Sequence, residues 1–151
     1  MCDMSATIGS LAAALAKAQG EMAAAQKSSD NPYFKSKYAD LSECWESCRG
    51  PLSKNGLAVI QTTEIKDGDA IGVVVNTTLA HSSGEWIRGT LFMPLAKKDP
   101  QAVGSAITYG RRYGMSAIVG IVADDDDGEA AMGRAQDGKT AAKQPPRQRP
   151  Q

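Results

Sequence analysis

Three short stretches rich in β-strand-forming residues, separated by two turns, constrain the fold of this chain more than any other feature. Residues 57–66 and 71–79 are rich in Val, Ile and Thr, and residues 85–93 alternate between two faces. The connecting residues, 67–69 and 80–84, are too few for a crossover between parallel strands. The sequence therefore predicts a three-stranded antiparallel meander.

A long helix is predicted after the meander, over residues 100–122. Asp99 is its expected cap, and Pro100 occupies the favoured first position. One stripe faces the sheet and includes two glycines that allow a close approach: Val103, Ile107, Gly110, Gly114, Ile118 and Ile121. The predicted fold class is α+β, with a β-β-β-α core.

Two amphipathic helices are predicted before the meander. The first covers residues 5–27 and is capped by Ser5. The second covers residues 39–54 and ends at Gly56, for which we expect a left-handed conformation. Its apolar positions, which recur at steps of three and four, are Leu41, Cys44, Trp45, Cys48 and Leu52.

Composition and charge indicate a single folded domain and exclude several classes of protein. The 151 residues suit one domain, and 42% hydrophobic residues allow a real core. Seventeen basic residues balance 17 acidic ones, which excludes a strongly basic, histone-like binder. No apolar run is long enough to span a membrane, and the N-terminus carries an acidic residue where a signal peptide needs basic ones. The three cysteines have no disulfide spacing, which indicates a reducing, cytoplasmic location with buried thiols at Cys44 and Cys48.

The C-terminal residues 133–151 contain no large apolar side chain. They carry five basic residues and one aspartate. We therefore predict one domain over residues 1–132, followed by a disordered basic tail.

Three motifs that resemble enzyme sites are interpreted as accidental or structural. The Walker A pattern at residues 133–140 lacks the preceding strand and the following helix that a phosphate loop needs. His81 lies in a turn, where we expect local hydrogen bonds. The contiguous aspartates 124–127 cannot all converge on one metal ion, so neither a metal site nor a catalytic group is predicted.

The best local constellation lies on the long helix, opposite its core stripe. Tyr109, Arg112 and Tyr113 cluster there, with Arg111 at the boundary. An arginine can neutralise a phosphate while aromatic rings stack on bases of any sequence. From this helix alone, nucleic-acid binding and a surface patch or subunit contact are equally supported.

Several stretches together resemble the essential recombination function (ERF) family of phage single-strand annealing proteins. They are FKSKYADL at residues 34–41, TLAHSSGEW at residues 78–86 and DPQAVGSAITYGRRY at residues 99–113. Gly110 departs slightly from the family, which more often has alanine there. The resemblance implies a β-β-β-α core related to the eukaryotic strand-annealing recombinases, assembled into rings or helical filaments on DNA. It also implies ATP-independent annealing in the cytoplasm of a bacterial host.

Annealing requires neutralised phosphates and exposed base edges, but no bond chemistry and no cofactor. The predicted partners are single-stranded DNA, further copies of the chain, and a phage exonuclease or a host single-strand-binding protein. Two alternatives stay open: a metal-dependent nuclease that uses residues 124–127, and a protein that protects single strands without annealing them. The candidate DNA contacts are Lys35, Lys37, Arg111 and Arg112 for phosphates, and Tyr33, Tyr38, Tyr109 and Tyr113 for stacking.

Overall fold

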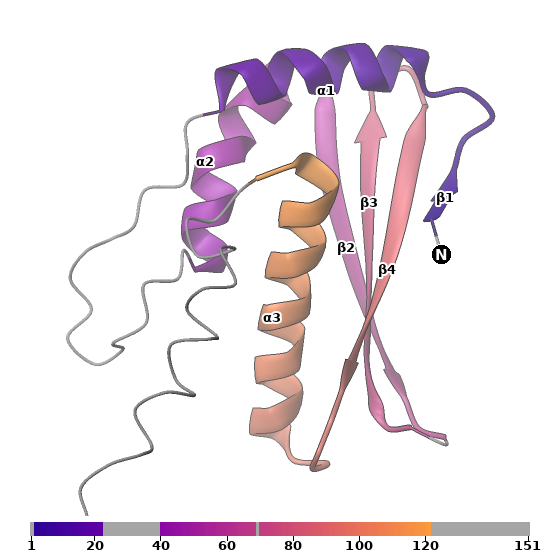
Figure 1. Ribbon diagram of the computed structural model, residues 1–151, viewed down its shortest axis with the longest axis vertical. Coiled ribbons are helices and arrows are strands. Elements are labelled where there is room, and N and C mark those ends of the chain that lie inside the picture. The colour runs from indigo at the N-terminus through magenta and orange to yellow at the C-terminus, as the bar shows by residue number, and fades with distance from the viewer. Residues whose placement is uncertain (1, 23–39, 69, 122–151) are drawn as a thin grey trace, which may run out of the picture.

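The computed structural model describes residues 2–22, 40–68 and 70–121. A four-stranded antiparallel sheet carries helices on one face and at one end, in an α+β arrangement (Figure 1). Along the chain the elements are β1 (Cys2–Met4), α1 (Gly9–Glu21), α2 (Leu41–Lys54), β2 (Leu57–Lys66), β3 (Gly72–His81), β4 (Trp86–Pro94) and α3 (Pro100–Val119).

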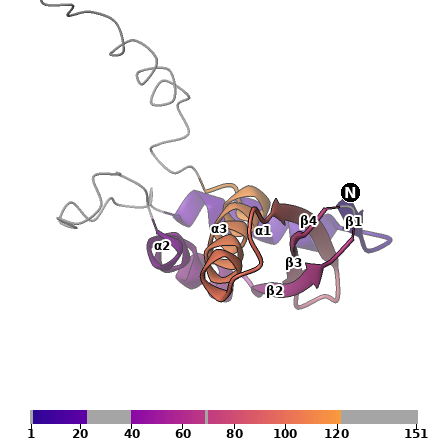
Figure 2. The ribbon, with the colours of Figure 1, turned by 90° about the horizontal axis from the view of Figure 1, so that it is seen from below.

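The predicted meander is confirmed. Strands β2, β3 and β4 pair in sequence order, with Val59 opposite Leu79 and Val75 opposite Leu91. Helices α2 and α3 lie on the same side of this sheet (Figure 2). The long helix that follows the meander packs on β3 and β4, as the predicted β-β-β-α order requires.

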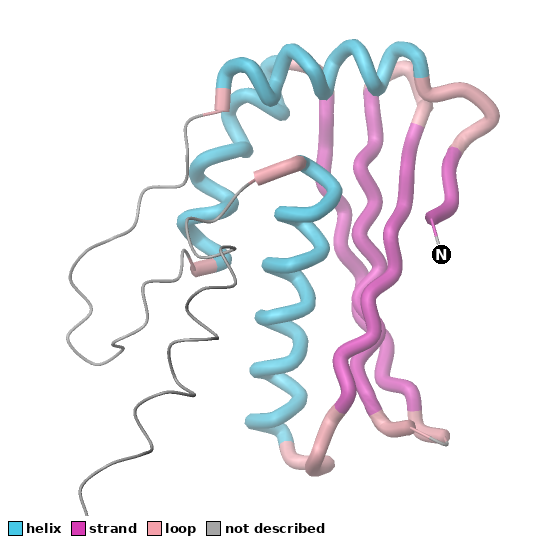
Figure 3. The backbone as a smooth tube through the Cα atoms, viewed as in Figure 1, coloured by secondary structure: helices cyan, strands magenta, loops and turns pink. Residues whose placement is uncertain are grey.

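One strand was not predicted. Strand β1 pairs with β4 at the edge of the sheet, with Asp3 opposite Arg88 (Figure 3). Three residues are too short a stretch to show a strand periodicity, so only the partner strand defines β1.

The expected start of the first helix is wrong. Ile8, not Ser5, occupies the N-cap of α1, and its side chain makes no capping hydrogen bond. The Ser5 hydroxyl instead accepts a hydrogen bond from the Trp86 N–H at 2.9 Å, because β1 draws this part of the chain to β4. Residues 23–27 of the predicted helix lie outside the described residues.

The other helix ends are defined by capping side chains and by glycines that lie next to them in the sequence. Asp40 caps α2 in a capping box with Glu43, so this helix begins two residues later than expected. Asp99 caps α3, and its side chain accepts from the Ala102 N–H. Helix α3 ends at Val119 rather than at residue 122, because Gly120 adopts the left-handed conformation, as Gly56 does after α2.

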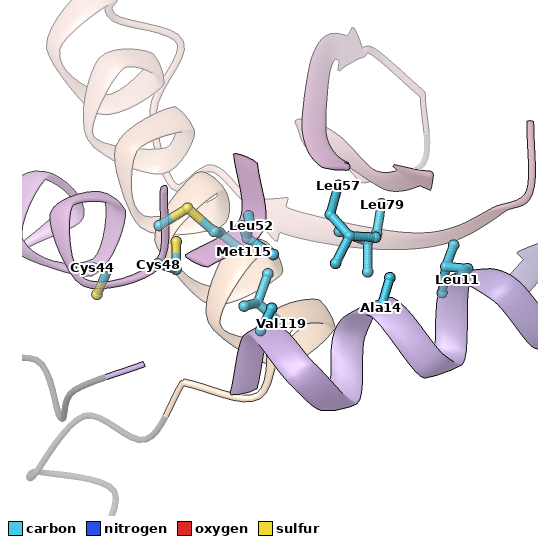
Figure 4. Packing of buried hydrophobic residues seen from close by; sticks show 10 residues of the cluster. Leu11, Ala14, Cys44, Cys48, Leu52, Leu57, Leu79, Met115 and Val119 are labelled. Atoms are coloured by element: carbon cyan, nitrogen blue, oxygen red, sulfur yellow. The ribbon is translucent and has the colours of Figure 1, made fainter. Parts of the chain in front are cut away.

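Two hydrophobic clusters form the core. The larger joins all three helices to the sheet and includes Leu11, Cys48, Leu52, Leu79 and Met115 (Figure 4). The smaller lies under the first half of α3 and contains Val73, Val75 and Ala106. Cys44 and Cys48 are buried as predicted, and burial raises the pKa of the Cys48 thiol to about 11, so this thiol stays protonated at neutral pH.

The face of α3 opposite the sheet is less open than predicted. Helix α2 packs against its second half, so Met115 and Val119 are buried. Ser116 of this helix directs its hydroxyl to the Cys44 sulfur on α2 at 3.9 Å.

The predicted close approach of α3 to the sheet is confirmed at both glycines. A methyl group at Gly110 would lie 2.6 Å from Val75 Cγ2, and one at Gly114 would overlap the Thr77 hydroxyl. The Thr77 hydroxyl is held in place, because it accepts a hydrogen bond from Gln61 Nε2 at 3.0 Å.

Replacing Gly114 with alanine is therefore expected to lower the free energy of unfolding. Overpacking costs roughly 1–3 kcal/mol and outweighs the gain in helix propensity of about 1 kcal/mol. Gly104→Ala is the matched control, because nothing lies within 4 Å of a methyl group there, and it should stabilise the protein. Urea unfolding followed by circular dichroism measures both, and equal effects at the two glycines would contradict the close approach.

Helix α1 receives its cap from a distant turn. Glu85 Oε2 accepts from the Leu11 N–H at 2.7 Å, and Glu85 Oε1 accepts from the Thr7 hydroxyl at 2.9 Å. A carboxylate at a helix N-terminus is favourable, because unpaired N–H groups gather there. The hydrogen bond from the Leu11 N–H is the main reason that the pKa of Glu85 lies below its ordinary value of 4.5.

Glu85→Gln is expected to lower the free energy of unfolding at neutral pH. A lowered folded-state pKa stabilises the fold above the unfolded-state pKa, and this contribution disappears as the pH falls through the folded-state pKa. The difference between the wild type and the variant should therefore shrink on acidification. Urea titrations at several pH values, from neutral to below 4.5, measure the free energy of unfolding of both proteins. Glu64→Gln is the control, because Glu64 is exposed on β2. A difference that is constant with pH would show that the carboxylate charge does not matter.

Candidate nucleic-acid interface

The Tyr-Arg cluster, formed by Tyr109, Arg112 and Tyr113, lies on one flank of α3. The two tyrosine rings are stacked, with centroids 6.3 Å apart and planes at 18°. The guanidinium carbon of Arg112 lies 5.3 Å from the centroid of the Tyr109 ring and 4.9 Å from that of Tyr113. The four-residue spacing of the tyrosines places both rings on the same side of the helix, so the sequence alone is enough to build this cluster.

The cluster combines positive charge with exposed aromatic surface. Tyr109 is 51% exposed and Tyr113 is 47% exposed. Cation–π contacts hold the guanidinium against the rings while keeping its charge. Such a surface can contact a phosphate and stack with unpaired bases without reading their sequence.

Arg111 lies on the other flank of α3, apart from the Tyr-Arg cluster. Its Nε donates to Gln61 Oε1 at 3.4 Å, and its carbonyl oxygen accepts from Gln61 Nε2 at 2.8 Å. One step of 100° along the helix separates Arg111 from Arg112. The two adjacent arginines therefore contact different neighbours, although both were predicted as phosphate contacts.

Arg111 borders a groove between α2, β2 and α3. The groove has a volume of about 560 Å³. We call it the Trp45 groove; its lining residues are Asp40, Leu41, Ser42, Trp45, Val59, Gln61, Thr108, Arg111 and Met115.

The apolar spacing of α2 predicts Trp45 on the buried side of its helix, but the structure leaves it 40% exposed. Cys44, Cys48 and Leu52 define the buried stripe of α2, and Trp45 lies at the edge of that stripe. This edge position is the sequence signal that could have indicated an exposed tryptophan.

A second cation–π pair lies on the sheet face away from α3. The Arg88 guanidinium carbon is 5.0 Å from the centroid of the Trp86 ring, and Arg88 Nε donates to Thr78 Oγ1 at 2.9 Å. The predicted strand pattern put Trp86 and Arg88 on one face, and this placement is confirmed by their pairing with Ala80 and Thr78.

The remaining candidate DNA contacts, Tyr33, Lys35, Lys37 and Tyr38, lie outside the described residues. The same holds for the aspartate run at residues 124–127 and for the Walker-like pattern.

Within the described part of the chain, no group of three metal-ligating side chains comes together. His81 makes the expected local contact, with its Nδ1 2.9 Å from Ser83 Oγ. None of the described helices combines the length and the hydropathy needed to cross a membrane.

Comparison with known proteins identifies one family. The family model described as the ERF superfamily matches residues 11–151. No curated protein and no solved structure matches the chain.

Proposed function

Because the chain belongs to the ERF superfamily, we propose that it binds single-stranded DNA and anneals complementary strands without ATP during phage homologous recombination. Membership of this family implies a role in phage recombination, and its proteins are generally non-catalytic. The observation that carries the proposal to this chain is the Tyr-Arg cluster, which offers a half-buried cation and two exposed stacking rings on one helix flank.

The physics of annealing matches what this cluster offers. Two DNA strands repel each other until their phosphates are neutralised, and Arg112 supplies a positive charge for that purpose. Stacking on Tyr109 and Tyr113 holds bases by their flat faces, so the base edges stay available for pairing. The reaction makes and breaks no covalent bond, so it requires no catalytic residue.

A single cluster of this size binds weakly, so we propose that the chain works as a ring or filament of many copies. Repeating the cluster around an assembly raises the affinity by avidity, without new contacts in each copy. The overall charge of zero is compatible with this, because acidic residues elsewhere balance a basic binding surface. We also propose that residues 1–132 form the annealing domain, that residues 133–151 form a basic tail, and that the partners include a phage exonuclease or a host single-strand-binding protein.

Complementary oligonucleotides, mixed with the protein in the absence of nucleotide and metal, test this function directly. We expect duplex formation to be faster than in buffer alone, and non-complementary strands to give no duplex. Slower duplex formation would indicate a protein that protects single strands. Shortened DNA on addition of a divalent cation would indicate a nuclease.

A further inference from the structure

The Trp45 groove is a candidate binding site on the opposite flank of α3 from the Tyr-Arg cluster. We propose that it takes one unpaired base of single-stranded DNA, stacked on Trp45, with the adjoining phosphate at Arg111. This inference rests on the proposed function, and it adds to each chain a DNA contact separate from the Tyr-Arg cluster.

The size and lining of the groove suit a base. Its volume of about 560 Å³ lies within the range of roughly 300–1,000 Å³ that is typical of small-molecule sites. Leu41, Val59 and Met115 supply apolar surface for the flat faces of a ring. The Ser42 hydroxyl can both donate and accept a hydrogen bond at the edge of a base. The Thr108 hydroxyl donates to the Gly104 carbonyl oxygen at 3.0 Å and can still accept a hydrogen bond from the base.

Trp45 is placed to act as the stacking surface. Cys44 and Cys48 anchor α2 in the core, which turns the neighbouring Trp45 toward the groove and leaves it 40% exposed. Aromatic side chains beside a cation are the common feature of sequence-independent single-strand binding. An indole offers the largest stacking area of any side chain.

Arg111 is held at the groove by the sheet. Gln61 on β2 accepts from Arg111 Nε, while the Gln61 Nε2 donates to the Arg111 carbonyl oxygen and to the Thr77 hydroxyl. The bond from Nε directs the Arg111 side chain toward β2, and the two bonds from Nε2 hold the Gln61 amide in place to accept it. A guanidinium has five N–H donors, and the Gln61 contact uses one, so a phosphate can still be bound.

Charge sets the direction of the bound nucleotide. Asp40 also lines the groove, and its carboxylate is fixed in the capping box, where Oδ1 accepts from the Glu43 N–H at 2.8 Å. A phosphate is repelled by this carboxylate and attracted by Arg111. The phosphate therefore belongs at Arg111 and the base beside Trp45.

The test uses the full-length protein and compares Trp45→Ala with Trp45→Phe. A short oligothymidylate that covers a single chain is titrated with each variant, and an abasic oligonucleotide of equal length is titrated in parallel. We expect Trp45→Ala to bind the oligothymidylate roughly 5- to 150-fold more weakly, the range for the loss of one stacked base. Trp45→Phe should retain most of the affinity. Binding of the abasic strand should not depend on the residue at position 45.

Tryptophan fluorescence gives a second measurement that does not depend on the stability of the alanine variant. The chain has two tryptophans, so Trp86→Phe leaves Trp45 as the only reporter. We expect the oligothymidylate to quench this fluorescence and the abasic strand to quench it less. Equal quenching by the two strands, or none, would overturn the base-binding groove.

The outcomes separate this inference from the proposed function. If the wild-type protein neither binds nor anneals single strands, the proposed function is wrong and the groove inference falls with it. If the wild type anneals but Trp45→Ala binds both strands as the wild type does, the groove inference alone is wrong. If Trp45→Ala instead breaks up an assembly of the protein in light scattering, the groove holds a second copy of the chain and the inference is again overturned.

Discussion

Arg112→Ala is expected to weaken single-strand binding by about tenfold or more per chain while the fold survives. The variant loses one charge-assisted phosphate contact, worth roughly 1.5–3 kcal/mol. It also loses the cation held against Tyr109 and Tyr113. In an assembly the loss is repeated in every copy, so the effect on a long strand should be larger.

Salt dependence identifies the lost contact. The slope of log affinity against log salt concentration should flatten by about 0.7 per lost phosphate contact, because fewer counterions are released from single-stranded DNA. The loss should be equal on two oligonucleotides of unrelated sequence, since the cluster contacts charge and ring faces rather than base edges.

Lys17→Ala is the matched control for this variant. Lys17 is an exposed cation on α1, so the change removes one charge away from the Tyr-Arg cluster. Circular dichroism checks that both variants fold. If Arg112→Ala binds like the wild type at every salt concentration, the Tyr-Arg cluster is a subunit contact, and the phosphate contacts belong to Lys35, Lys37 and Arg111.

Leu79→Ala is expected to have the largest effect on stability, a loss of roughly 2–5 kcal/mol in the free energy of unfolding. Leu79 is fully buried on the central strand β3, in the cluster that joins α1, α2 and α3 to the sheet (Figure 4). This loss is a large part of the roughly 5–15 kcal/mol that stabilises an ordinary domain.

Urea unfolding measures the effect, with Ile60→Ala as control. Ile60 lies on β2 and is 52% exposed, so its truncation should cost about 1 kcal/mol or less. Equal losses at the two positions would mean that Leu79 does not anchor the helices.

Elements defined by local chemistry could be predicted well from the sequence. The apolar and polar alternation of residues 85–93 gave β4 within one residue at each end, and the residues of β2 were predicted without error. Gly56 ends α2 in the left-handed conformation because its neighbours in the chain decide that geometry. The spacing of Tyr109 and Tyr113 is likewise local, so the Tyr-Arg cluster could be predicted from the sequence of α3 alone.

Features that join distant parts of the chain could not be predicted. Ser5 was predicted to cap the first helix, but its hydroxyl accepts a hydrogen bond from the Trp86 N–H of β4 instead. The N-terminus of α1 is capped by the Glu85 carboxylate, which lies 74 residues away from Leu11 in the chain. A short strand such as β1 has no signal of its own, because the hydrogen bonds that define it come from another strand.

The sequence by itself determined the order of the three helices and of strands β2, β3 and β4, the two glycines that bring α3 to the sheet, and the Tyr-Arg cluster, because each depends on periodicity or on spacing within one element. Only the tertiary structure decided that Arg111 and Arg112 contact different neighbours and that Trp45 lines a groove. The hydrogen bond between Gln61 and the Arg111 carbonyl joins positions 50 residues apart. No local pattern records such a contact, because it forms only when the packing of α3 on the sheet brings the two residues together.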